Sequence, residues 1–331
     1  MKKFLLTAAV MGLLLSSCTR SEDPKLLRMY TCFDPNEAEI YLRAFEADTG
    51  IRVKWVRMSS GEVLARIKAE AKNPQMGLWL GGTAADYAAA KKENLLAPYV
   101  PRTEFTLAPE QRDPEGYWTG FYSGVIGFAS NTRFLAAHGL APPSSWQDLL
   151  KPAFQGQIGV AYPYTSSTAY TLVTSLVTLM GEDQAFDYLK KLDGQVHHYN
   201  KSGPACVTQV GLGELGVGIA YAHDIVTKGV AKGYPVALSF PQEGSGTELG
   251  AMALLRGGLD QAQARRFMDW MLTARAQKLM QNWNRTPLNP QARAAAASAG
   301  AAPSRLIPVD IEWAGQNRER LIARWRQATG K

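Results

Sequence analysis

The sequence predicts an α/β protein of two lobes, joined by two crossing strands around a central cleft. Strand-like runs alternate with helical periodicity over most of the chain, which is typical of parallel sheets covered by helices. Most of these runs end in a short polar or glycine-rich loop, where proteins of this class bind ligands. Two further runs, 117–131 with its three internal glycines and 248–255, are suited to pass between the lobes.

The start of the chain resembles a bacterial lipoprotein signal. Lys2 and Lys3 precede an apolar run that is shorter than the roughly 20 residues of a membrane span. Leu15-Ser16-Ser17-Cys18 then has the form of a lipoprotein cleavage site. We expect a signal peptide over 1–17, a lipid on Cys18 and a polar tether over 18–25. The alternative is a plain signal peptide that is cut nearby and leaves Cys18 unmodified.

Composition limits the possible functions. The net charge of +7 suits an anionic ligand, but the basic residues are spread out and form no block typical of nucleic-acid binding. A length of 331 residues with 46% hydrophobic content is enough for two medium α/β domains. Cys32 and Cys206 are the cysteines that follow Cys18, and a disulfide between them is possible.

The first lobe is predicted to begin with residues 26–120. Its strands, 26–31, 51–56 and 77–80, are each followed by a polar loop and, in the first two cases, by a clear helical pattern. The candidate ligand-binding residues in these loops are Ser59, Ser60, Gly82 and Thr83.

The second lobe is predicted over residues 121–245 and contains the most informative stretch, 157–180. A strand at 158–162 leads through a cluster of hydroxyl residues into a helix. The first turn of a helix carries partial positive charge and free N–H groups, so it favours an oxyanion. An ordinary helix cap is the structural alternative. The candidate residues in this cluster are Thr165, Ser166, Ser167 and Thr168.

Three later loops of this lobe complete the candidate site. Ser202 follows the strand at 195–199, His223 and Asp224 follow the strand at 215–221, and Glu243 lies in a glycine-rich turn after 236–240. The chain should then return to the first lobe over 246–285, with a helix over 262–284. Segment 286–331 should form helices that pack on the lobes, chiefly the second, with one basic terminal helix over 313–329.

These landmarks, taken in order, resemble the extracytoplasmic solute-binding proteins of ABC importers, in particular their ferric-iron-type branch. The resemblance implies the type II periplasmic-binding-protein fold and covers essentially all of the chain after the signal. Its landmarks are Met58-Ser59-Ser60-Gly61-Glu62, Gly81-Gly82-Thr83, Phe128-Ala129-Ser130-Asn131-Thr132, Pro143-Ser144-Ser145-Trp146-Gln147-Asp148-Leu149-Leu150, Phe154-Gln155-Gly156-Gln157-Ile158 and Thr165-Ser166-Ser167-Thr168-Ala169-Tyr170.

At one position this sequence differs from the ferric-binding members, and the difference indicates another ligand. They bind iron through an adjacent tyrosine pair, but this sequence reads Tyr221-Ala222-His223-Asp224 at that position. It is more similar there to the hexose-phosphate-binding members of the branch, which have a His-Asp pair and an acidic residue near Glu243. A tract like Leu179-Met180-Gly181-Glu182-Asp183 is also shared with those members.

The candidate residues divide by chemistry. Hydroxyl groups at 59–60 and 165–168 can donate to a phosphate, whereas His223, Asp224 and Glu243 can bind sugar hydroxyls. A helix cap at Asp224 and a solvated turn residue at Glu243 are the structural alternatives. This division predicts a ligand with a phosphate end and a polyol or amine end.

We therefore predict a lipid-anchored solute-binding protein of the periplasm or cell surface, which captures a sugar phosphate by cleft closure. Its partners would be an ABC permease with its ATPase and, through Cys18, a membrane surface. It would be a monomer without cofactor, metal or nucleic-acid partner. A sensor of sugar phosphate or phosphoglycerate that signals to a membrane histidine kinase, a phosphonate binder and a ferric-iron binder remain alternatives. The sequence has no nucleophile elbow, no metal-spaced histidine cluster and no P-loop, so we do not expect an enzyme.

Overall fold

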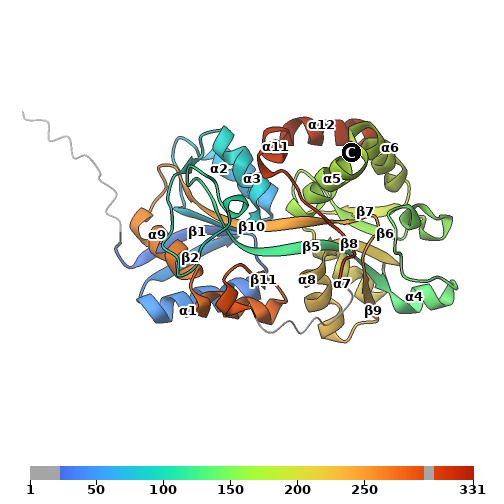
Figure 1. Ribbon diagram of the computed structural model, residues 1–331, viewed down its shortest axis with the longest axis horizontal. Helices are drawn as coiled ribbons and strands as arrows, with labels where there is room; N and C mark the ends of the chain where they lie inside the picture. Colours follow the sequence, from blue (N-terminus) through green and yellow to red (C-terminus); the bar gives the residue numbers. More distant parts are fainter. Residues whose placement is uncertain (1–22, 294–301) are drawn as a thin grey trace, which may run out of the picture.

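The computed structural model describes residues 23–293 and 302–331 (Figure 1). The predicted signal peptide, Cys18 and most of the tether lie outside these residues. None of the described helices is both long and apolar enough to cross a membrane.

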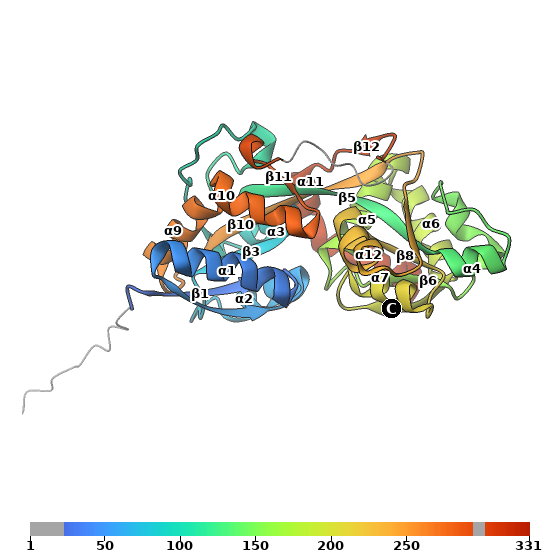
Figure 2. The same cartoon turned by 90° about the horizontal axis from the view of Figure 1, so that it is seen from below.

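The structure has two lobes that lie side by side, with two long strands running between them (Figures 1 and 2). This arrangement confirms the predicted fold class. The elements of the first lobe that precede the crossing are β1 (Leu26–Thr31), α1 (Pro35–Thr49), β2 (Arg52–Arg57), α2 (Ser60–Ala69), β3 (Leu78–Thr83), α3 (Ala84–Lys92), β4 (Leu96–Ala97) and η1 (Pro109–Gln111).

The crossing strand β5 (Thr119–Asn131) leads into the second lobe, and β10 (Ser245–Leu255) leads back. Between them lie α4 (Thr132–Ala137), η2 (Gln147–Leu150), η3 (Pro152–Phe154), β6 (Ile158–Ala161), α5 (Ser167–Met180), α6 (Glu182–Asp193), β7 (Val196–Asn200), α7 (Ala205–Leu212), β8 (Val217–Tyr221), α8 (Ala222–Lys228), η4 (Val230–Lys232) and β9 (Val236–Ser239).

The chain after β10 differs from our expectation in two places. A single helix was expected over 262–284, but the structure has α9 (Gln261–Met271), α10 (Ala274–Lys278) and η5 (Leu279–Trp283). The remaining elements are β11 (Thr286–Pro287), η6 (Pro290–Ala292), β12 (Leu306–Ile307), α11 (Ile311–Gln316) and α12 (Arg318–Thr329). Asn317 thus divides the expected terminal helix into two.

The C-terminal helices contact both lobes. We expected them to pack chiefly on the second lobe, and α12 does lie against α6 there. α11, however, packs against α3 of the first lobe (Figure 1). The α11–α12 junction is therefore a further covalent connection between the lobes, in addition to β5 and β10.

The sheet order explains why the predicted loops meet. In the first lobe β1 pairs in parallel with β2 and β3, and in the second lobe β6 pairs in parallel with β7 and β8. β5 and β10 run antiparallel to each other between these two sets. The carboxyl ends of parallel strands lie at one edge of a sheet, and here both edges face the junction of the lobes.

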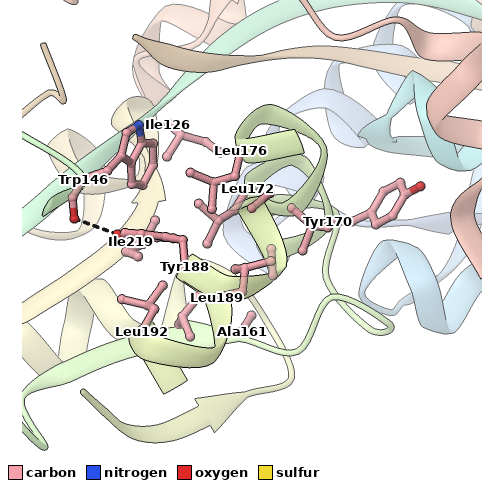
Figure 3. Close-up of a cluster of buried hydrophobic side chains, with 14 of the residues drawn as sticks. Ile126, Trp146, Ala161, Tyr170, Leu172, Leu176, Tyr188, Leu189, Leu192 and Ile219 are labelled. Atoms are coloured by element: carbon pink, nitrogen blue, oxygen red, sulfur yellow. Dashed lines mark hydrogen bonds between the residues drawn. The ribbon is translucent and has the colours of Figure 1, made fainter. Parts of the chain in front are cut away.

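Each lobe has apolar clusters on both faces of its sheet. Met29 and Tyr30, neighbours in β1, belong to different clusters because successive side chains of a strand point to opposite faces. In the second lobe, Leu172 and Leu176 of α5 pack with Ile219 of β8 (Figure 3). These rigid layers hold the strand ends, and hence the loops between the lobes, in fixed positions.

Candidate ligand-binding site

A polar cavity of about 340 Å³ lies between the lobes at the ends of the parallel strands. The loops after β1, β2 and β3 line one side, and the loops after β6, β7 and β8 line the other. The predicted residues that the structure brings together in its lining are Ser59, Ser60, Gly82, Ser166, Ser167, Thr168, Ser202, His223 and Asp224.

Three predicted residues lie elsewhere. Glu243 accepts hydrogen bonds from Ser145 Oγ (2.5 Å) and the Trp146 amide (3.4 Å), so it fixes a loop of the second lobe. Thr165 Oγ1 donates to the carbonyl of Lys201 (2.8 Å) and joins two loops behind the cavity wall. Thr83 is buried at the start of α3. None of these three residues lines the cavity, so the structure does not bring them together with the other candidates.

Arg57 is a cavity residue that our sequence reasoning missed. It ends β2, where Nη2 donates to Ser202 Oγ (3.0 Å) and Nε to the Phe33 carbonyl (3.4 Å). Within the described part of the chain it forms no ion pair with a carboxylate, so its charge is available to a ligand. The alternating exposure along β2 could have indicated this position, because Arg57 lies with Val53 and Trp55 on the less exposed face of the strand.

Hydroxyl groups gather beside Arg57 at the start of α5. The side chains of Ser166 and Thr168 are buried, and both line the cavity together with Ser167. The loop after β7 packs closely against them. Glycine at position 203 allows this approach, since an added Cβ would lie 2.2 Å from Thr168 Oγ1. A guanidinium, several hydroxyl groups and the positive end of a helix form a site suited to an oxyanion.

A second set of groups in the cavity lining is connected by Arg285, which joins the two lobes. Its Nε and Nη2 donate to the two carboxylate oxygens of Glu37 (2.6 and 3.0 Å), and its Nη1 lies 2.7 Å from Nε2 of His223. Arginine only donates, so Nε2 must accept and the imidazole proton lies on Nδ1. Burial, assisted by the charge of Arg285, lowers the pKa of His223 well below its ordinary value of 6.5. His223 is therefore neutral.

Two carboxyl groups accompany His223. Burial raises the pKa of Asp224 from 3.8 to about 6 and that of Glu248, on β10, from 4.5 to about 8. Tyr122 donates to Glu248 Oε1 at 3.0 Å. A Cβ at Gly124 would lie 2.9 Å from Nδ1 of His223 and 3.1 Å from Glu248 Oε2, so glycine lets the two side chains share this space. Glu248 lines the cavity, whereas Glu243, the glutamate that the sequence suggested, does not.

The raised pKa of Glu248 predicts a specific pH dependence of stability. Between about pH 4.5 and 8 the folded state keeps a proton that the unfolded state has released, so stability falls as the pH rises through this range. The raised pKa of Asp224 acts in the same direction but only up to about pH 6. The lowered pKa of His223 acts in the opposite direction, and only below about 6.5.

The interval from pH 7 to 8.5 therefore reports chiefly on Glu248, with a smaller contribution of the same sign from the raised pKa values of the buried Cys32 and Cys206 thiols. Urea unfolding should show a decrease of about 1–2 kcal/mol over this interval, at about 1.4 kcal/mol per pH unit for one proton. Glu248→Gln should flatten the dependence, whereas Glu243→Gln, in the preceding turn, should leave it unchanged. An unaltered slope in Glu248→Gln would show that another group holds the proton.

The lobes touch each other around the cavity. Lys228 of the second lobe pairs with Asp34 of the first (2.6 Å), and the amide of Gly61 donates to the carbonyl of Thr165 (2.9 Å). A Cβ at Gly61 would lie 2.2 Å from the carbonyl oxygen of Tyr164. Glycine at this position lets the start of α2 approach the opposite lobe.

The cysteines and Tyr221 test two alternatives that the sequence left open, a disulfide and a ferric-iron site. Cys32 and Cys206 are both free thiols, so the possible disulfide between them is not formed. Tyr221 donates to Thr171 Oγ1 (2.9 Å), and burial raises its pKa well above 10. A tyrosinate ligand is therefore disfavoured at this position. No group of three or more potential metal-ligating His, Cys, Asp or Glu side chains occurs within 23–293 and 302–331.

Two α/β lobes, strands that cross between them and a polar cavity at the strand ends together define a periplasmic binding protein of type II. Comparison with known proteins agrees with this class. Residues 85–311 match the family described as bacterial extracellular solute-binding protein. The chain therefore belongs to this family.

Three similar proteins show how varied its relatives are. An uncharacterised protein of Haemophilus influenzae is 32% identical over 301 residues, covering 87% of this chain and 86% of the relative. The structure of the periplasmic binding protein AfuA from Actinobacillus pleuropneumoniae, with exogenous fructose-6-phosphate bound, has 31% identity and a TM-score of 0.85, covering 92% of this chain and 98% of AfuA. Iron uptake protein A1 of Synechocystis is 26% identical, covering 83% of this chain and 81% of the relative.

Proposed function

We propose that the protein is the solute-binding component of an ABC importer and that its solute is a sugar phosphate. The observation that carries this proposal is that one cavity is lined by two sets of groups with different chemistry. Arg57 and the hydroxyl groups of α5 suit a phosphate, whereas Glu248, Asp224 and His223 suit the hydroxyl groups of a sugar. A fully ionised inorganic anion such as sulfate would gain nothing from the carboxylates, and a free sugar would leave the charge of Arg57 without a counter-ion.

The similarity to AfuA supports the same ligand class, because that structure contains fructose 6-phosphate. A ferric ion fits this cavity less well, since Tyr221 is held as a neutral phenol and Arg57 and Arg285 add positive charge. Capture followed by transfer to a permease, lipid attachment at Cys18 and the absence of catalysis belong to this proposal.

Isothermal titration calorimetry of the mature protein would test the ligand class. The panel would contain fructose 6-phosphate, glucose 6-phosphate, glycerol 3-phosphate, 2-aminoethylphosphonate, free fructose and ferric citrate. We expect the hexose phosphates to bind most tightly. Tight binding of ferric ion or of the phosphonate, with none of the hexose phosphates, would contradict the proposal.

Arg57→Gln tests the phosphate end of the site. Loss of one charge-assisted hydrogen bond should weaken fructose 6-phosphate binding about 10- to 100-fold. Arg52→Gln is the matched control, because Arg52 lies on the same strand but is exposed and pairs with Asp23. An equal effect of the two substitutions, or no effect of Arg57→Gln, would show that the phosphate is bound elsewhere.

A further inference from the structure

A buried ion pair lies directly behind the cavity wall. Arg318, the first residue of α12, places Nε 2.7 Å from Oδ1 of Asp86 in α3, and their side chains are 9% and 0% exposed. The guanidinium also lies over the ring of Tyr170 and donates to the Tyr164 carbonyl. Neither Arg318 nor Asp86 lines the cavity. The pair is thus close to the site without contacting a ligand in it.

Asp86 uses its second oxygen to bind a residue that does line the cavity. Ser60 Oγ donates to Asp86 Oδ2 at 2.5 Å, the short distance typical of a hydroxyl that donates to a charged carboxylate. A serine hydroxyl has one hydrogen, so this bond consumes its only donor. Gly82 leaves the space that this arrangement needs, since a Cβ there would lie 2.3 Å from Ser60 Oγ.

We infer that Asp86 and Arg318 are positioning residues, which make Ser60 an acceptor for a hydroxyl group of the ligand. This inference rests on the proposed function, which supplies such a hydroxyl. It also changes the role that the sequence indicated for Ser60, because we had placed this residue among the donors to the phosphate. The oxygens of a doubly ionised phosphomonoester only accept, so they gain no hydrogen bond from the lone pairs of Ser60.

Asp86→Asn should reverse the polarity of Ser60. The amide has two unlike ends, and only its carbonyl oxygen can accept from Arg318. Its NH₂ group must then face Ser60 Oγ and donate to it. The hydroxyl hydrogen of Ser60 is released and can point into the cavity, so the residue becomes a donor.

The experiment compares the wild-type protein with Ser60→Ala, Asp86→Asn and the double variant, by calorimetry with fructose 6-phosphate and with methyl phosphate, a phosphomonoester without hydroxyl groups. In the wild-type background Ser60→Ala should weaken fructose 6-phosphate binding about two- to twelvefold, the range of one neutral hydrogen bond, and leave methyl phosphate unchanged. In the Asp86→Asn background the same change should weaken methyl phosphate by a similar factor. Ser166→Ala, at the phosphate end, should weaken both ligands in either background.

The outcomes separate this inference from the proposed function. Equal weakening of both ligands by Ser60→Ala in the wild-type background would overturn the role of Ser60 as an acceptor, even though the sugar phosphate still binds. An unchanged affinity for methyl phosphate between Asp86→Asn and the double variant would overturn the reversal. Failure of the wild-type protein to bind fructose 6-phosphate would overturn the proposed function and this inference with it. If Asp86→Asn does not fold, the Ser60→Ala comparison decides the question alone.

Discussion

Replacing Gly61 by alanine should prevent the lobes from closing on a ligand. The new Cβ would lie 2.2 Å from the carbonyl oxygen of Tyr164, and this backbone atom of the opposite lobe cannot move aside without opening the cleft. A ligand held by one lobe alone loses at least two charge-assisted hydrogen bonds, so affinity should fall by a factor of about 150 or more. Calorimetry with fructose 6-phosphate measures this loss.

Small-angle X-ray scattering provides the second measurement. The wild-type protein with saturating ligand should have a smaller radius of gyration than Gly61→Ala with the same ligand. Gly61 lies in the first turn of α2, where alanine favours the helix, so local unfolding would not account for the loss. Gly194→Ala, at the far end of α6, is the control and should bind normally. Full compaction of Gly61→Ala would show that closure does not need this contact.

Replacing Arg285 by methionine should cost about 3–5 kcal/mol of folding stability, because it removes one partner of a buried ion pair. The side chains of Arg285 and Glu37 are 8% and 1% exposed, so Glu37 would keep a buried charge without a counter-ion. The guanidinium also lies over the rings of Phe33 and Tyr122, at 4.8 and 4.6 Å from their centres. Urea unfolding at pH 7 measures the loss.

Arg275→Met is the matched control for this substitution. The Arg275 side chain is 67% exposed and pairs with Asp48 at the surface, where such a pair contributes about 0–1 kcal/mol. Combining Arg285→Met with Glu37→Gln should restore part of the stability, because no unpaired charge then remains. An equal cost for Arg275→Met and Arg285→Met would show that burial of the ion pair has little influence on its contribution.

The order of strands and loops could be predicted from the sequence because it depends on local patterns. Alternation and helical periodicity located the parallel strands, and parallel strands place their carboxyl ends at one edge. This rule was enough to bring Ser166, Ser202 and His223 into one cavity, although they follow three different strands. The hydroxyl groups at the start of α5 were predicted for the same reason.

The residues that were missed depend on contacts between distant parts of the chain. Arg285 and Glu37 are 248 positions apart, and no periodicity relates them. The sequence placed Glu248 in the strand that returns to the first lobe, and Glu243 in the candidate site. Because β10 already begins at Ser245, Glu248 lies within the strand and beside the cavity, while Glu243 stays in the turn. The position of a turn relative to a strand start is decided by sheet pairing, which local sequence does not specify.

The connection through α11 and α12 has a consequence for the energetics of capture. Two adjacent strands alone leave the lobes free to twist as well as to open, whereas a link at a separate place on the molecule restrains twisting. Arg318 strengthens this restraint because it contacts Asp86 in one lobe and Tyr164 in the other. We therefore expect the unliganded protein to sample fewer relative orientations of its lobes. Closure on a solute should then cost less orientational entropy, so that a larger part of the contact energy is retained as affinity.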